Sequence, residues 1–269
     1  MIKSLLLMAC LALSLILIPA TPAQANLVTK TVEYKDDGLS CKGYLAYDDA
    51  IRGKRPGVLV VHEFYGLNNF AKKKAEELAG LGYVALAADM YGKGLVTTDR
   101  QEAGKHASAL RSTPPLLRAR AQAALKVLAD NPLVDPKRLA AIGFCFGGTT
   151  VLELAYSGAD LKGVVSFHGG LLKPNVEEVK GVKAAILVLH GADDPHIKAE
   201  EIAAFQEAMR QGGADWQMVF FGGTVHSFMN PEAGSDKAGG VAYDPRTARR
   251  SWQYMKDFFK EIFTVKGRD

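Results

Sequence analysis

The sequence predicts an α/β fold in which a mostly parallel central sheet carries helices on both faces. Short, continuous apolar runs such as 56–62 and 184–190 recur along the chain, and such runs are typical of strands buried on both faces of a sheet. Segments with apolar residues at helical spacing alternate with these runs, which is the pattern of a parallel sheet with crossover helices. Functional sites of such sheets lie at the carboxyl ends of the strands. The residues that follow each apolar run are therefore the candidates for a site.

The first 25 residues differ from the rest and indicate a secretory signal peptide. Lys3 is their only charged residue, residues 5–18 form an apolar core, and Ala23-Gln24-Ala25 is a small-x-small cleavage site. A transmembrane anchor is the alternative, but the apolar run is shorter than the ~20 residues that span a bilayer. The segment Leu7-Met8-Ala9-Cys10 resembles a lipoprotein signal only faintly, because it lies too early in the apolar core. We expect cleavage after Ala25 and a periplasmic or secreted protein.

The remaining chain, residues 26–269, has the size and composition of a single globular domain. The full sequence has 269 residues, of which 48% are hydrophobic and 23% charged. Loss of Lys3 lowers the formal net charge from +4 to +3, which is too small to indicate binding to nucleic acid or to a membrane surface. The two remaining cysteines, Cys41 and Cys145, lie in an early strand and a sharp turn, which argues against a disulfide. Cysteine and histidine spacing gives no zinc signature. We expect no metal and no organic cofactor, and we expect a monomer.

The expected elements follow from the same pattern in chain order. The chain begins with a hairpin, because Asp36-Asp37-Gly38 separates two extended segments. Gly82 closes the first helix. The expected strands are 27–34, 41–47, 56–62, 83–88, 138–143, 163–167, 184–190 and 216–221. The expected helices are 70–81, 100–111, 114–129, 149–155, 197–211 and 247–263, the last with Trp252, Met255, Phe259 and Ile262 at helical spacing.

The stretch Gly143-Phe144-Cys145-Phe146-Gly147-Gly148 ends an apolar run and leads into a helix. A strand that turns sharply into a helix raises one side chain above the edge of the sheet, and glycines remove the Cβ atoms that would clash in the turn. The raised side chain is Cys145, and the helix N-terminus beside it favours a thiolate. A buried cysteine after a glycine turn is the alternative. The glycine spacing matches neither a dinucleotide-binding fingerprint nor a phosphate loop, which would need a lysine before Thr149.

Two later strands end in residues that could act with Cys145. Asp193 and Asp194 follow one buried run, and His226 follows the last strand. The order nucleophile, acid, histidine is that of the α/β-hydrolase triad, in which a base activates the nucleophile and a carboxylate orients the base. We assign the acid to Asp194, which stands three residues after Gly191 and directly before a proline, and keep Asp193 as the alternative. For His226 the alternative is a loop histidine without a catalytic role.

An oxyanion hole in such a site needs two backbone N–H groups. One is expected from Phe146, which follows the nucleophile, and the other from Phe64, in the loop after the strand 56–62. Other histidines at strand ends are expected to line or support the pocket: His62, His168 and His190.

The chain resembles the dienelactone hydrolase (carboxymethylenebutenolidase) family over nearly all of residues 26–269. The matching motifs are Gly38-Leu39-x-Cys41-x-Gly43-Tyr44-Leu45, His62-Glu63-Phe64-Tyr65-Gly66-Leu67-Asn68, Asp89-Met90-Tyr91, Gly143-Phe144-Cys145-Phe146-Gly147-Gly148, the Asp194 loop and Gly223-Thr224-Val225-His226-Ser227-Phe228. The resemblance implies an α/β-hydrolase fold and a triad of Cys145, His226 and Asp194. It also implies that Glu63 approaches the resting thiol and helps to remove its proton when substrate binds. A carboxylate that caps its own loop is the alternative for Glu63.

The arginines with which members of this family hold a substrate carboxylate are not matched here. The resemblance places one of them after the Asp-x-Tyr segment, where Tyr91 and Lys93 stand, and the other four residues beyond His226, where Asn230 stands. Lys93 could replace the first as a flexible point charge, so Tyr91 and Lys93 are the expected substrate contacts. Asn230 cannot replace the second, which argues against dienelactone itself as the substrate. Three further arginines are expected to point mostly at solvent from the closing helix: Arg246, Arg249 and Arg250.

The sequence therefore predicts a hydrolase of ester, lactone or thioester bonds in small molecules. An esterase for carbohydrate or xenobiotic esters is the alternative within this class. The alternative outside it is a non-catalytic binding protein or a thiol redox protein on the same scaffold. A redox role for Cys145 would need a second, resolving cysteine, and only Cys41 is available in residues 26–269.

Overall fold

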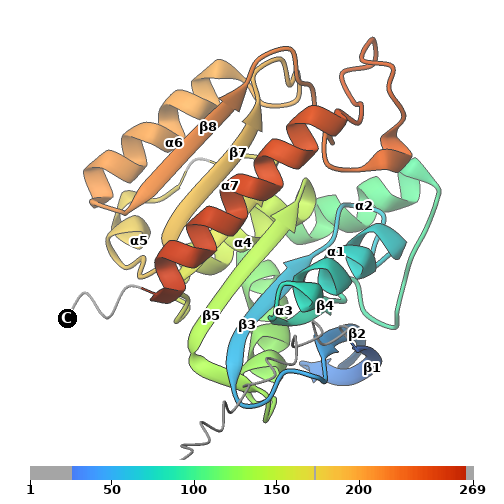
Figure 1. Ribbon diagram of the computed structural model, residues 1–269. Helices are drawn as coiled ribbons and strands as arrows, with labels where there is room; N and C mark the ends of the chain where they lie inside the picture. Colours follow the sequence, from blue (N-terminus) through green and yellow to red (C-terminus); the bar gives the residue numbers. More distant parts are fainter. Residues whose placement is uncertain (1–25, 173, 265–269) are drawn as a thin grey trace, which may run out of the picture.

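The centre of the fold is an eight-stranded sheet in the order β1-β2-β4-β3-β5-β6-β7-β8 (Figure 1). The computed structural model describes residues 26–172 and 174–264, so the predicted signal peptide lies outside the described residues. β1 pairs with β2, and β2 with β4, in antiparallel orientation, and the other pairs are parallel. The strands are β1 (Leu27–Asp36), β2 (Leu39–Asp48), β3 (Arg55–Val61), β4 (Val84–Ala88), β5 (Val134–Phe144), β6 (Gly163–Phe167), β7 (Ala185–Gly191) and β8 (Trp216–Phe221).

Helices cover both faces of the sheet, as the sequence predicts (Figure 1). The helices are α1 (Asn69–Gly80), α2 (Arg100–Arg111), α3 (Pro114–Ala129), α4 (Phe146–Tyr156), α5 (Val176–Lys180), α6 (Ala199–Gly212), the short 3₁₀ helix η1 (Pro231–Ala233) and α7 (Pro245–Thr264). α1 and α7 share one apolar core with one face of the sheet, to which Phe70 and Phe259 belong. α3, α4 and α6 lie over the other face, with Leu117, Val151 and Phe205 in its core.

Local sequence determines where several helices begin. The Asn68 side chain accepts a hydrogen bond from the Ala71 N–H at the start of α1, and Asp99 accepts from the N–H groups of Gln101 and Glu102 in α2. α3 begins with Pro114, where a helix needs no N–H donor. The bounds of α2, α3, β6 and β8 are those predicted from the sequence.

The register of the sheet brings the predicted site loops together. Val61 at the end of β3 pairs with Gly143 in β5, and Phe144 pairs with Phe167 at the end of β6. β7 lies between β6 and β8. The neighbouring strands β3, β5, β6, β7 and β8 all run parallel. Their carboxyl ends therefore form one edge, where the loops that begin with His62, Cys145, His168, Ala192 and Gly222 meet.

The two cysteines of the described chain are free thiols. Cys41 lies on β2 and is buried in the core, whereas Cys145 follows β5 and is partly exposed. In the described ranges 26–172 and 174–264, no helix combines the length and the apolar character needed to cross a membrane.

Candidate active site

Cys145 stands at the sharp turn between β5 and α4 in a left-handed backbone conformation, with φ 52° and ψ −111°. Such a conformation costs about 1–3 kcal/mol in a residue with a side chain and persists only where the surroundings enforce it. Close packing provides this enforcement. A methyl group on Gly143 would overlap the carbonyl of Gly147, and one on Gly147 would overlap the carbonyl of Val61 on β3. The glycines predicted around the cysteine are thus required by contact between strand, turn and helix.

The side chain of His226 is held by Asp194. The Nδ1 of His226 lies 2.7 Å from Oδ2 of Asp194, and Oδ1 of Asp194 accepts the backbone N–H of His196 at 2.9 Å. Asp193 is exposed, and its backbone N–H donates to the carbonyl of Thr224. The geometry therefore brings Asp194, and not Asp193, to the histidine.

The electrostatics of this pair favour a charged imidazole. Burial opposes a charge on His226, but negative charge on the Cys145 sulfur and the hydrogen bond with Asp194 raise its pKa to about 10. Burial acts to raise the pKa of Asp194, yet the hydrogen bond with His226 leaves that pKa below its usual value. The His226 imidazole is thus held between the Asp194 carboxylate and the Cys145 sulfur, and both neighbours favour its charged form.

The loop after β3 lies beside the start of α4. The His62 ring stacks on the Phe146 ring at 5.8 Å between centroids, and its Nδ1 bonds the carbonyl of Glu63. The Tyr91 hydroxyl donates to the carbonyl of Phe64 at 2.7 Å, which fixes the orientation of that part of the loop. Among the hydrogen bonds of the described residues, none uses the N–H of Phe64 or Phe146. Both amides predicted for an oxyanion hole are free donors.

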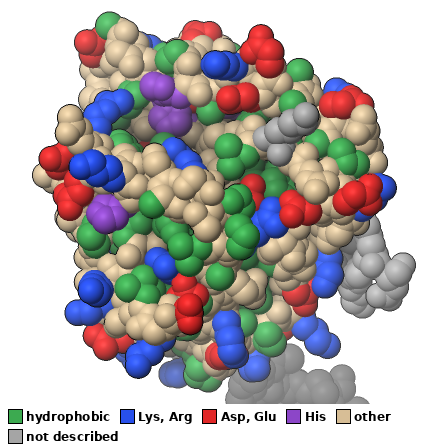
Figure 2. Space-filling model, turned by 180° about the vertical axis from the view of Figure 1, so that it is seen from behind, with side chains coloured by type: hydrophobic (Ala, Val, Ile, Leu, Met, Phe, Trp, Pro, Cys, Tyr) green, Lys and Arg blue, Asp and Glu red, His purple; other side chains and the backbone are tan. Residues whose placement is uncertain are grey.

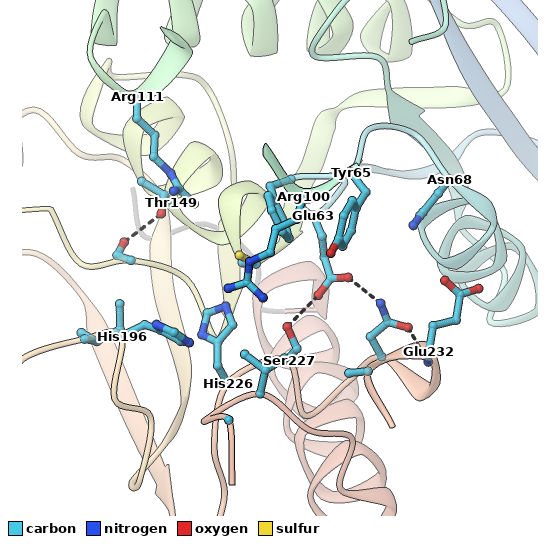
Figure 3. Close-up of a pocket in the computed structure, with 18 of the residues that line it drawn as sticks. Glu63, Tyr65, Asn68, Arg100, Arg111, Thr149, His196, His226, Ser227 and Glu232 are labelled. Atoms are coloured by element: carbon cyan, nitrogen blue, oxygen red, sulfur yellow. Dashed lines mark hydrogen bonds between the residues drawn. The ribbon is translucent and has the colours of Figure 1, made fainter. Parts of the chain in front are cut away.

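Glu63 is buried, and its carboxylate is directed at the loop that follows His226 (Figure 3). Oε1 accepts from the Ser227 hydroxyl at 3.2 Å, and Oε2 accepts from the Asn230 amide at 2.6 Å. The amide oxygen of Asn230 accepts the N–H of Glu232, which fixes its NH₂ toward Glu63. Burial raises the pKa of Glu63, against the lowering effect of the Asn230 bond. Within the described chain no hydrogen bond joins Glu63 to Cys145, so its predicted action on the thiol stays a prediction.

A cavity of about 990 Å³ opens at this edge of the sheet and is lined by Cys145, His226 and Glu63. Apolar side chains also line it, among them Leu171 and Ile197. Figure 2 shows histidine side chains beside a hollow in the face opposite to the view of Figure 1. The cavity is large enough for a drug-sized organic molecule.

Neither Tyr91 nor Lys93, the predicted substrate contacts, is among the residues that line the cavity. The turn that carries Lys93 wraps around Asp89, whose carboxylate accepts the N–H groups of Gly92 and Gly94 at 2.8 Å each. The N–H of Lys93 donates to the carbonyl of Ser40 on β2, and its side chain is exposed. Tyr91 supports the Phe64 loop instead.

Two arginines of α2, which the sequence analysis did not single out, line the cavity, whereas Lys93 does not. Arg111 and Arg100, the last and first residues of α2, both line the cavity and extend into it (Figure 3). Arg111 lies over the Phe146 ring at 5.5 Å, and its Nε is buried without a hydrogen-bond partner in the described chain. No acidic side chain pairs with Arg111 among the described residues. The only sequence signal was an arginine in the last turn of a helix, which is common in helices that bind nothing.

These features define an α/β-hydrolase fold with Cys145 at the sharp turn between β5 and α4. Residues 41–263 match the model of the dienelactone hydrolase family, and the chain belongs to that family. The solved structure called m3DLH is 43% identical, with a TM-score of 0.85, and covers 88% of this chain and 98% of its own. P91, a dienelactone hydrolase-like promiscuous phosphotriesterase from metagenomic libraries, is 42% identical with a TM-score of 0.85, over 89% and 99% of the two chains. A protein of Aquifex aeolicus (strain VF5), provisionally named a carboxymethylenebutenolidase, is 27% identical over 85% of this chain and 96% of its own.

Proposed function

We propose that this protein hydrolyses carboxylic esters, lactones or thioesters with Cys145 as the nucleophile. The observation that carries the proposal is that Cys145 and His226 both line a large cavity, while Asp194 holds the His226 ring from behind. Membership of a hydrolase family supports it.

The geometry supports a two-stage reaction. The Cys145 sulfur attacks the carbonyl carbon, and the N–H groups of Phe64 and Phe146 bind the oxyanion that forms. His226 donates its proton to the leaving alkoxide or thiolate, which leaves a thioester on the enzyme. His226 then accepts a proton from water, and the hydroxide attacks the thioester. The sulfur leaves as thiolate, His226 keeps the proton taken from water, and the second product is a carboxylic acid that releases its own proton to solvent.

Arg111 supports substrates that carry a negative charge. A guanidinium that is partly buried and has no acidic partner gains most from an anion that enters with the substrate. Replacement of Arg111 by Gln should therefore lower kcat/KM for 4-nitrophenyl hydrogen succinate about 10- to 100-fold, the cost of losing a charged partner. The neutral 4-nitrophenyl acetate should be affected less than about threefold.

Lys93→Gln is the matched control for this prediction, because Lys93 is a cation that lies outside the cavity. Lys93→Gln should leave kcat/KM unchanged for both esters. An equal loss for both esters in Arg111→Gln would contradict charge recognition and indicate a structural role.

Stoichiometric acylation tests the proposed function itself. One equivalent of 4-nitrophenyl acetate should release a burst of nitrophenol and add an acetyl group to the peptide that contains Cys145. The same reaction with Cys145→Ala should give no burst. Turnover that survives in Cys145→Ala would refute the proposal. A panel of lactones, aryl esters and thioesters then ranks the substrate classes.

Hydrolysis of phosphotriesters is a second candidate, favoured by the 42% identity to P91 over nearly the full length of both chains. Paraoxon belongs in the same panel for this reason. Steady release of nitrophenol from paraoxon that depends on Cys145 would support this activity, whereas irreversible labelling of Cys145 would identify paraoxon as an inhibitor.

We also propose that the protein acts outside the cytoplasm after cleavage behind Ala25. The N–H of Asn26 donates to the Asp48 carboxylate at 3.0 Å, so an α-amino group created there would meet a negative partner. Mass spectrometry of the exported protein should find Asn26 as the first residue. A retained Met1 or a lipid on Cys10 would rule out this processing.

A further inference from the structure

His168 contacts the backbone of the nucleophile, although the reaction proposed above does not use it. It directly follows β6 and is fully buried. Its Nδ1 accepts the N–H of Cys145 at 3.1 Å, and the same N–H lies 3.0 Å from the carbonyl oxygen of Phe167. Two consecutive residues at one strand end therefore hold the amide of Cys145.

This hold acts on a strained residue. Cys145 would relax from its left-handed conformation unless its surroundings prevented it. His168 is itself anchored, because its N–H donates to the carbonyl of Leu189 on β7 at 2.9 Å. The His168 ring also packs edge-on against the Phe228 ring at 5.0 Å. The acceptor of the Cys145 amide is thus a rigid part of the sheet edge.

The hydrogen bond needs a neutral imidazole, because an Nδ1 that accepts cannot carry the proton. The proton is therefore on Nε2, which is buried without a hydrogen-bond partner among the described residues. Burial lowers the pKa of His168 well below its usual value, and charge on His226, whose ring centroid is 5.1 Å away, lowers it further, as does His190. His168 stays an acceptor while His226 carries a proton.

We propose that His168 is a positioning residue, whose Nδ1 holds the amide of Cys145 so that the sulfur stays aligned with His226. The inference rests on the proposed function, because alignment with His226 affects turnover only if Cys145 attacks a substrate. His168 does not line the cavity and so does not touch the substrate. A displacement of about 1 Å at a reacting atom can cost 10²-fold in rate.

Two substitutions separate the acceptor from the bulk of the ring. His168→Asn places an amide oxygen at the position of Nδ1, whereas His168→Leu keeps the volume and removes the acceptor. Ser166→Ala is the control, because it removes a buried polar atom of β6 that has no hydrogen-bond partner in the described chain. Each full-length mature variant is assayed for kcat and KM with 4-nitrophenyl acetate, for alkylation by iodoacetamide at pH 7, and for thermal melting.

His168→Leu should lower kcat and the alkylation rate by roughly 10- to 100-fold with KM within about threefold. His168→Asn and Ser166→Ala should keep both rates within about threefold of the wild type. The inference fails if His168→Leu matches the wild type, or if a folded His168→Asn is as slow as His168→Leu. If His168→Leu does not fold, His168→Gln replaces it, because its acceptor lies one methylene too far and should not restore the rate.

The two proposals can fail separately. If the wild type hydrolyses no ester, the proposed function fails, while the alkylation rates still report whether His168 aligns the thiol. If the wild type forms the acyl-enzyme and all His168 variants do so equally well, only the positioning role fails.

Discussion

At Cys145 the conformation of the backbone and the environment of the side chain are linked. The left-handed conformation directs the sulfur into the cavity at the N-terminus of α4, where the helix dipole favours negative charge. His226 supplies the opposite charge and is itself oriented by Asp194. The strain at one residue is therefore compensated by contacts that also prepare its chemistry.

Asp194→Asn should lower kcat by about 10³-fold or more, since the imidazole loses both its orienting acceptor and its counter-charge. Asp193→Asn, at the neighbouring exposed position, should change kcat less than about threefold. Steady-state kinetics with one activated ester compares the two variants. A reversed result would move the acid to Asp193 and leave the rest of the site as described.

Glu63→Gln tests whether the buried carboxylate acts on the thiol. Gln keeps the size of the side chain and can still bond Ser227 and Asn230, but it cannot take up a proton. We expect acylation in pre-steady-state experiments to slow by about 10²-fold or more, within the range of general-base effects, with little change in melting temperature.

Ser227→Ala is the control for Glu63→Gln, because it removes one hydrogen bond to the carboxylate and leaves its charge. It should destabilise the protein by about 1 kcal/mol and retain most of the acylation rate. If Glu63→Gln acylates as fast as the wild type, Glu63 only ties its own loop to the loop after His226.

At the scale of elements, close packing of α4 against β3 determines where Cys145 stands. Gly147→Ala would force a methyl group against the Val61 carbonyl and should destabilise the protein by about 1–3 kcal/mol or prevent folding. Gly104→Ala in α2 is the matched control, because a methyl group there meets no atom within 4 Å. Its higher helix propensity should stabilise the protein by about 0.5–1 kcal/mol. Urea denaturation measures both changes, and a Gly147→Ala protein of wild-type stability would contradict the packing argument.

The sequence predicts most elements because a parallel strand that is buried on both faces consists of an apolar run between turn residues. Several other bounds are shifted by one to three residues, and two larger differences have local reasons. β5 begins at Val134 and not at 138, because Arg55 pairs with Val134 ahead of a register shift at Pro56/Gly57. Residues 135–138 are polar apart from one proline, so the start of β5 does not stand out as an apolar run. α5 (Val176–Lys180) was not predicted, because five residues are too few to show a helical period.

At the scale of the whole molecule, the site divides into parts that follow chain order and parts that do not. Cys145, Asp194 and His226 stand in loops that each follow a strand, as do the two amides proposed for the oxyanion hole. Topology alone therefore brings them to one edge. Arg111 reaches the cavity only because tertiary packing places the end of α2 over Phe146. Lys93 lies outside the cavity, because the turn that carries it is held by hydrogen bonds to the Asp89 carboxylate. A side chain delivered by a helix end or a turn conformation cannot be located from its neighbours in sequence.

Stability should depend on pH through the buried histidines that the fold keeps neutral. Nε2 of His62 accepts the N–H of Met90 at 3.3 Å, which joins the ends of β3 and β4. Burial lowers the pKa of His62 to about 4, against weaker raising effects of Glu63 and Asp89. In the unfolded chain this histidine titrates near 6.5. Its contribution to stability is therefore complete above about pH 6.5 and is lost as the pH falls toward 4.

His62→Gln removes this titration and keeps a donor and an acceptor at the joint between β3 and β4. The variant should be less stable than the wild type at pH 7.5, and the difference should shrink below pH 6.5 by up to about 1.4 kcal/mol per pH unit, the limit for one proton. Urea denaturation at intervals from pH 7.5 to 4.5 measures the two slopes. Gln101→Ala, at an exposed side chain of α2 that does not titrate, should run parallel to the wild type. If His62→Gln also runs parallel to the wild type, His62 does not couple folding to protonation, and the acid sensitivity must arise elsewhere in the molecule.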